Sequence, residues 1–139
     1  MELTQQQKYE VIEDWIKKLR SGEYKQTKRS LKDCNGHCCL GVFMESVNEK
    51  FNIGTWTLFN GRFMFEQLNL EGNKLIDTAW IPPNIKEIFG FDSSFVDISY
   101  KGEQTYLSSL NDSYDLSFAE IADLVEEQIL PKYKEQQCK

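Results

Sequence analysis

Apolar positions recur at helical spacing near both ends of the chain, and this periodicity predicts an amphipathic helix at each end. Thr4 and the glutamine three residues later form a capping-box signal, and Gly22 suits the end of the first helix. Ser117 and Glu120 give the same signal for the last helix, which Pro131 ends. The two apolar stripes consist of Val11, Ile12, Trp15, Ile16 and Leu19, and of Phe118, Ile121, Ala122, Val125 and Ile129.

Between these helices the pattern predicts mixed structure. A second helix is expected from about Cys38 to Lys50. Residues 55–59 and 62–65 are rich in aromatic and β-branched side chains and flank Asn60-Gly61, which is a strong signal for a β-hairpin. A further strand is expected near Leu75 and Ile76.

The sequence of residues 82–110 predicts three short elements of secondary structure. A helix opens at Pro82-Pro83 and closes at Gly90, a strand covers residues 95–98, and residues 105–110 favour a short helix. The whole order predicts one α+β domain over residues 1–139, with a small antiparallel sheet packed by about four helices. Residues 132–139 are expected to form a frayed tail.

Composition narrows the class of protein. With 139 residues, 40% hydrophobic and 13% aromatic, the chain can form one hydrophobic core and is not a disordered segment. No apolar run is long enough to cross a membrane, and the first residues lack a signal-peptide pattern, so we expect a cytoplasmic protein with reduced thiols. A net charge of −6 argues against general coating of DNA.

Positive charge is concentrated in one segment of this acidic chain. Residues 15–32 contain seven of the 16 basic residues and one acidic residue, Glu23. They lead directly to the predicted start of the second helix, where free backbone N–H groups and the positive end of the helix dipole favour an anion. We therefore expect a binding site for a small phosphorylated ligand or nucleotide. Its expected residues are Arg20, Tyr24, Lys25, Gln26, Lys28, Arg29, Lys32, Gly36, His37 and Cys38.

In this interpretation each group has a role. The amides near Gly36 and Cys38 hold phosphate, the cations supply charge, Tyr24 stacks on a base and Gln26 reads the edge of that base. Neither a Walker loop nor a dinucleotide-binding pattern is present. A solvated charged loop is the alternative interpretation of the basic residues.

Two chemistries of the cysteine cluster are less well supported. Cys34, His37, Cys38 and Cys39 supply only half of the usual zinc-ligand pattern, and Cys138 is far along the chain, so no metal or other cofactor is expected. A thiol at a helix N-terminus has a lowered pKa, but His37 directly precedes Cys38 and is badly placed as its base. We expect no catalytic residue.

Residues 102–131 contain no Lys or Arg and seven acidic residues. Most are expected on the solvated face of the last helix. Asn111 and Asp112 form a second candidate patch, although these residues can also simply shape a loop. A basic loop facing an acidic helix also allows self-association, so a homo-oligomer remains an alternative.

Four motifs carry a resemblance that covers most of the chain. They are Leu19-Arg20-Ser21-Gly22 with Tyr24 and Gln26, Cys38-Cys39-Leu40-Gly41-Val42, Leu110-Asn111-Asp112, and Ser117 to Asp123. Together they resemble a family of small proteins of tailed phages and prophages. In that family an aromatic residue usually precedes the double cysteine, where this chain has His37.

The resemblance transfers no catalytic residue and implies a context. Small phage accessory proteins often act on the host, including as antagonists of antiviral defence. We therefore expect a binding protein that sequesters a nucleotide signal without catalysis. One alternative is a protein-binding inhibitor or structural accessory protein that uses hairpin aromatics such as Trp56 and Phe63 as anchors. A nucleotide-processing enzyme is the third interpretation.

Overall fold

The N-terminal helix follows directly from its local sequence. The structure, a computed structural model, describes residues 2–68, 72, 74–77 and 80–134. Helix α1 (Gln5–Ser21) begins with a complete capping box: the Gln7 N–H donates to the Thr4 hydroxyl at 3.0 Å, and the Thr4 N–H donates to the Gln7 side chain at 2.8 Å. It ends at Gly22, whose φ of 78° lies in the left-handed region. The predicted apolar stripe is buried along its whole length.

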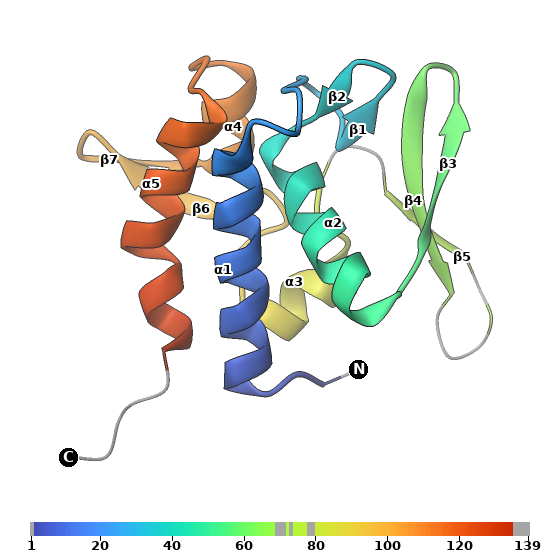
Figure 1. The fold of residues 1–139 in the computed structure, drawn as a ribbon, viewed down its shortest axis with the longest axis horizontal. Helices are drawn as coiled ribbons and strands as arrows, with labels where there is room; N and C mark the ends of the chain where they lie inside the picture. The colour runs from blue at the N-terminus through green and yellow to red at the C-terminus, as the bar shows by residue number, and fades with distance from the viewer. Residues whose placement is uncertain (1, 69–71, 73, 78–79, 135–139) are drawn as a thin grey trace.

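Three helices pack side by side and form the helical half of the molecule (Figure 1). Helix α1 lies between α2 (Cys39–Phe51) and α5 (Phe118–Gln128), and a 3-10 turn, η1 (Leu130–Tyr133), continues α5. The capping box predicted at Ser117 is present. No helix in the described part of the chain is both long and apolar enough to cross a membrane.

Five strands of the described chain form an antiparallel sheet beside these helices (Figure 1). Its strands are β1 (Lys32–Asp33), β2 (Gly36–His37), β3 (Thr55–Phe59), β4 (Arg62–Leu68) and β5 (Lys74–Asp77). The order is β2-β1-β4-β3, and β5 also pairs with β4. The predicted hairpin is confirmed: Asn60 and Gly61 have φ of 51° and 79°, which is the type I′ geometry.

The segment after the sheet contains α3 (Pro83–Phe89), β6 (Asp97–Tyr100), β7 (Glu103–Tyr106) and α4 (Leu107–Asp112). Among the described strands, β6 pairs with β7 alone. Two predicted boundaries are wrong here. The strand expected at 95–98 begins at Asp97, because the backbone turns at Val96 with a φ of 62°. The helix expected at 105–110 begins at Leu107, because Thr105 and Tyr106 pair with β6.

The predicted fold class is confirmed: the chain is α+β, with a small antiparallel sheet and an Asn-Gly hairpin. The described residues contain five α-helices, of which four have seven residues or more. The strand expected near Leu75 and Ile76 is β5. Of the expected frayed tail, residues 132 and 133 belong to η1, and residues 135–139 lie outside the described residues.

Candidate functional site

The basic loop between α1 and α2 lies directly on the start of α2. The Cys38 N–H donates to the Leu31 carbonyl at 3.0 Å, and the His37 N–H donates to the Lys25 carbonyl at 2.8 Å. A Cβ on Gly41 would come within 1.8 Å of the Leu31 carbonyl oxygen. Glycine inside this helix is therefore explained by the backbone that packs on it. The same holds for Gly36, because a Cβ at this position would lie 2.2 Å from the Lys25 carbonyl oxygen.

Asn111 is the centre of a polar junction that joins three segments: the basic loop, the start of α2 and α4. Its side chain is fully buried. Its Oδ1 accepts from the Gln26 side chain at 2.8 Å and from the Cys39 N–H at 3.2 Å. Its Nδ2 donates to the Thr27 carbonyl at 2.8 Å and to Asp112 Oδ1 at 2.9 Å. All four hydrogen-bonding positions of the amide are thus used within the protein, and we call this network the Asn111 junction.

The junction occupies the groups that a base or a phosphate would need. The Gln26 side-chain amide also donates to the Leu116 carbonyl at 2.8 Å, so both of its N–H groups have partners. The Gly36 N–H donates to Asp33 Oδ1 at 3.0 Å. Together with the bonded amides of His37, Cys38 and Cys39, this shows that the expectation of free amide donors at the start of α2 is wrong. The identity of the ligand-binding residues stays a prediction.

Two predicted cations are paired with the acidic C-terminal region. Arg20 donates to Asp123 at 2.8 Å and to Glu126 at 3.0 Å, which joins the end of α1 to α5. Lys28 pairs with Asp115. Basic residues of the N-terminal region and acidic residues of the C-terminal region therefore pair within one chain, as exposed ion pairs that each contribute little to stability.

Lys32 packs into the sheet. Its ammonium lies 4.6 Å from the centre of the Phe63 ring and 5.3 Å from that of Trp56, and 3.7 Å from Glu45 Oε2. These contacts hold the cation against the rings of β3 and β4 and the carboxylate of Glu45.

Lys25 and Arg29 are the most available cations of the predicted site. Both residues are exposed, and within the described part of the chain neither side chain takes part in an ion pair. Arg29 has a φ of 64°, and its N–H donates to Asp112 Oδ1 at 3.1 Å. Asp112 thus holds the loop that carries Arg29.

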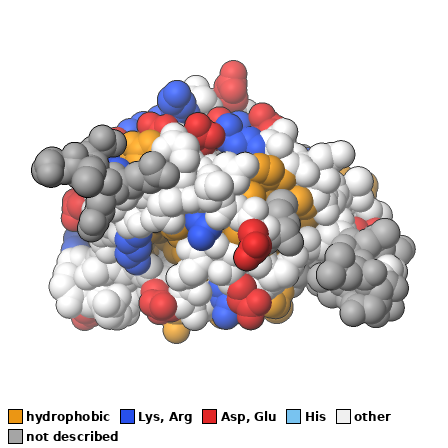
Figure 2. Space-filling view, turned by 90° about the horizontal axis from the view of Figure 1, so that it is seen from below, with side chains coloured by type: hydrophobic (Ala, Val, Ile, Leu, Met, Phe, Trp, Pro, Cys, Tyr) orange, Lys and Arg blue, Asp and Glu red, His pale blue; other side chains and the backbone are white. Residues whose placement is uncertain are grey.

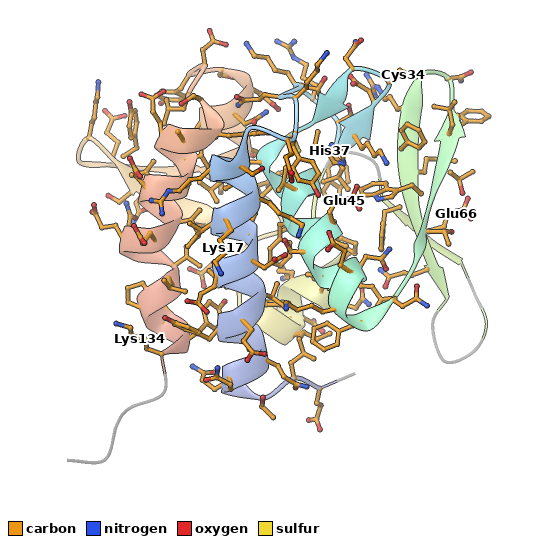
Figure 3. All side chains as sticks on the ribbon, viewed as in Figure 1. Lys17, Cys34, His37, Glu45, Glu66 and Lys134 are labelled. Carbon is orange, nitrogen blue, oxygen red and sulfur yellow. The ribbon has the colours of Figure 1, made fainter. Side chains whose placement is uncertain are left out.

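His37 and Glu45 point toward one another between β2 and α2, whereas Cys34 lies in the β1–β2 turn (Figure 3). The His37 Nε2 lies 2.7 Å from Glu45 Oε2, and the Trp56 indole N–H donates to Glu45 Oε1 at 3.0 Å. Burial alone would raise the pKa of Glu45, but the bonds from His37 and Trp56 more than offset it and leave this pKa below its ordinary value. The edge-on contact of the Tyr24 and His37 rings, at 5.1 Å, completes the cluster.

The thiols at the start of α2 are buried and inert. Burial raises the pKa of Cys38 to about 12, although this residue occupies the N-cap position of α2. Burial also raises the pKa of Cys39, whose thiol donates to the Leu107 carbonyl at 3.6 Å. Cys34 is exposed, and Cys138 lies outside the described residues. No group of three or more His, Cys, Asp or Glu side chains among the described residues is arranged to hold a metal ion.

A cavity of about 230 Å³ lies at the other end of α1, lined by Gln5, Lys8, Phe89 and Tyr133 among others. No residue of the predicted site lines it. The face seen in Figure 2 shows basic, acidic and hydrophobic side chains interspersed, without a large region of one charge.

Exposed apolar side chains are the feature that sequence reasoning missed. Leu58 and Phe59 in β3 are 53% and 61% exposed, and Trp80, Phe95 and Tyr106 are exposed as well. Trp56 and Phe63, the expected anchors, are half-buried instead. Alternation along the strand separates Trp56 from Thr55 and Thr57, its neighbours in the sequence. It does not show that Leu58 and Phe59 are exposed at the tip of the hairpin, because that depends on which other elements cover the tip.

The fold and these contacts define a small α+β protein whose loop-to-helix junction is closed by a buried asparagine. A family model described as Domain of unknown function (DUF8296) matches residues 7–129, and the chain belongs to this family. Neither the curated proteins nor the solved structures gave a match to this chain.

Proposed function

We propose that this protein is a non-catalytic binding protein that engages a protein partner along the free edge of β3. The proposal rests on the backbone edge of β3, which is unpaired among the described strands. β3 pairs with β4 on one side, and no other described strand pairs with it. Its sequence, Thr-Trp-Thr-Leu-Phe, contains no charge and no proline, which are the usual means of protecting an edge from pairing.

The register of the hairpin identifies the groups available to a partner. Phe59 and Arg62 flank the two-residue turn, so hydrogen-bonded and non-bonded pairs alternate from there. In the non-bonded pairs, Trp56 and Leu58 direct their backbone N–H and C=O groups away from β4. A partner strand could therefore add to β3, as in β-augmentation. Phe59, 61% exposed, would act as an apolar anchor beside it.

The resemblance to small proteins of tailed phages supports a more specific form of this proposal. In it the protein is a phage or prophage accessory factor in the host cytoplasm, and its partner is a host protein, for example a component of antiviral defence. The motifs that carry the resemblance, such as Leu110-Asn111-Asp112, lie at the Asn111 junction and maintain the fold. They would thus support the binding surface and make no contact with the partner.

Affinity purification from host cells with matched variants tests the proposal. Thr57→Lys places a charge on the edge strand, and Phe59→Thr removes the exposed ring while keeping a β-forming residue. Gln104→Lys, on the exposed β7, is the control for a lysine added to a strand. We expect a partner bound by wild type and by the control, and affinity reduced about tenfold or more by either edge variant. Equal binding by all four proteins would exclude the β3 edge.

A second candidate function, sequestration of a phosphorylated ligand or nucleotide, is favoured by one observation. Lys25 and Arg29 are exposed, lie in the same loop as Lys28, and take part in no ion pair among the described residues. Calorimetry with cyclic nucleotides, on wild type and on the double variant Lys25→Glu with Arg29→Glu, tests it. Binding that the double variant abolishes would support sequestration if the ligand is released unchanged, and a nucleotide-processing enzyme if it is altered. Binding that the variant retains would exclude this surface.

A further inference from the structure

Three exposed aromatic rings form a continuous row on the side of the molecule that carries β6 and β7. The ring centres of Trp80 and Phe95 are 5.8 Å apart, and those of Phe95 and Tyr106 are 5.6 Å apart. The three residues are 42%, 39% and 42% exposed. Single exposed aromatics are ordinary, but three on a surface, with the middle ring in contact with the other two, are typical of a recognition site. We call Trp80, Phe95 and Tyr106 the aromatic row.

The backbone beneath the aromatic row is well ordered by hydrogen bonds. The Ile81 N–H donates to the Ser94 carbonyl at 3.0 Å, which joins the segment of Trp80 to that of Phe95. The Leu107 N–H donates to the Val96 carbonyl at 2.8 Å, which joins the segment of Tyr106 to the same loop. These bonds hold the rings in position before any partner arrives, so little conformational entropy is lost on binding.

The carboxylate of Asp97 lies beside the aromatic row. Asp97 is the register partner of Tyr106 in the β6–β7 pair, and both are exposed, so they share the outer face. Side chains in such a pair have Cβ atoms about 4.5–5.5 Å apart. Asp97 Oδ1 accepts from the Ser93 hydroxyl at 2.6 Å, and within the described residues Oδ2 has no hydrogen-bond partner.

Along the segment that carries Phe95 and Asp97 the charges have one sign, whereas Lys8 and Lys132 line the cavity to which Asp97 also contributes. Between Lys86 and Lys101 the chain contains Glu87, Asp92 and Asp97 and no basic residue. The negative faces of aromatic rings and a neighbouring carboxylate both attract a cation. An anionic or purely apolar partner would leave the Asp97 carboxylate unpaired at the interface.

We propose that the aromatic row and Asp97 form a binding site for an arginine side chain of a protein partner. A planar guanidinium can stack on an aromatic face and at the same time donate to a carboxylate, which a lysine ammonium does less well. Tyr106 supplies the ring face next to the carboxylate, and Phe95 and Trp80 extend the apolar surface for residues that flank the arginine. This site is separate from the β3 edge and does not depend on the proposed function.

The indole N–H signals of the protein in solution test the site by NMR. Trp15 donates to the Cys39 carbonyl at 2.9 Å and Trp56 donates to Glu45, so only the exposed Trp80 should respond to a ligand at the row. The probes are an acetylated and amidated Gly-Arg-Gly peptide and the matched Gly-Gln-Gly peptide. We expect the arginine peptide to shift the Trp80 signal saturably, with a dissociation constant at least about threefold lower than that of the glutamine peptide.

Variants separate this site from general charge attraction. Asp97→Asn removes the carboxylate, and Tyr106→Leu keeps apolar bulk but removes the ring face, so each should weaken arginine binding about threefold or more. Glu103→Gln removes the same charge from the other end of β7 and should change binding by less than about twofold. Equal affinity for both peptides, an equal effect of Glu103→Gln and Asp97→Asn, or no effect of Tyr106→Leu would overturn the proposal. The dispersed spectrum of each variant shows whether it is folded.

Discussion

Replacing Asn111 by alanine should destabilise the protein strongly. The side chain is fully buried and makes four hydrogen bonds, to Gln26, Thr27, Cys39 and Asp112. Asn111→Ala removes all four at once and leaves a polar cavity at the meeting point of α2, α4 and the basic loop.

The magnitude follows from what remains unpaired. The Gln26 and Asp112 side chains lie near solvent and can bind water instead. The Cys39 N–H and the Thr27 carbonyl lose their partner inside the protein, and each buried group left unsatisfied costs about 1–3 kcal/mol. Together with the lost packing, we expect the free energy of unfolding to fall by about 3–5 kcal/mol, which is a large share of the usual total of about 5–15 kcal/mol.

Urea denaturation followed by circular dichroism measures this change. Asn48→Ala is the matched control, because among the described residues Asn48 Oδ1 accepts two N–H groups, those of Ile53 and Gly54 at 2.8 and 3.0 Å, and the site is partly exposed. The control should cost about 1–2 kcal/mol. In an Asn111→Ala background, Gln26→Ala should cost less than it does in wild type, because only the bond to the Leu116 carbonyl is left to lose. A loss below about 1 kcal/mol for Asn111→Ala would refute the reasoning.

Three further predictions concern the same region. Gly41→Ala should destabilise the fold by at least about 1–3 kcal/mol in thermal or urea unfolding, because its Cβ would collide with the Leu31 carbonyl; an unchanged midpoint would contradict this close approach. The pKa of Glu45 lies below its ordinary value of 4.5, so the ionised carboxylate stabilises the fold above that pH, and this stabilisation is lost as pH falls through the folded pKa. The melting temperature of wild type should therefore exceed that of Glu45→Gln at neutral pH and converge with it in acid. A constant difference in melting temperature across this pH range would contradict the prediction. Cys38 should resist iodoacetamide in the native state while the exposed Cys34 reacts, as peptide mapping by mass spectrometry would show; equal labelling would argue against the buried thiol.

Local signals in the sequence were sufficient for most elements of the fold. The capping boxes at Thr4 and Ser117 and the Asn-Gly turn each involve residues within a few positions, so their geometry follows from local chemistry. The start of β6 could not be placed in this way. Val96 adopts a φ of 62°, which a β-branched residue rarely does and which its local sequence does not predict, and its side chain is buried in the core.

The candidate site shows where local reasoning ends. The spacing of the cations and Gly36 predicted an anion site, but their partners come from distant parts of the chain. Asn111 bonds to the Cys39 N–H across 72 residues, and Arg20 pairs with Asp123 across 103. Periodicity and charge density along a sequence do not show which distant side chains occupy a group. The sequence predicts the basic loop at the start of the second helix but gives Asn111 only as a second, separate patch. The place of Asn111 at this junction follows only from its contacts.

Hydrogen exchange of the backbone amides of Cys38 and Cys39, followed by NMR in the unliganded protein, tests the Asn111 junction most directly. If these amides bond to Leu31 and Asn111 as the structure shows, they exchange only when the core opens, as slowly as amides in the middle of α1. Exchange at the rate of an open loop would mean that the start of α2 is free to receive an anion, and would contradict the account.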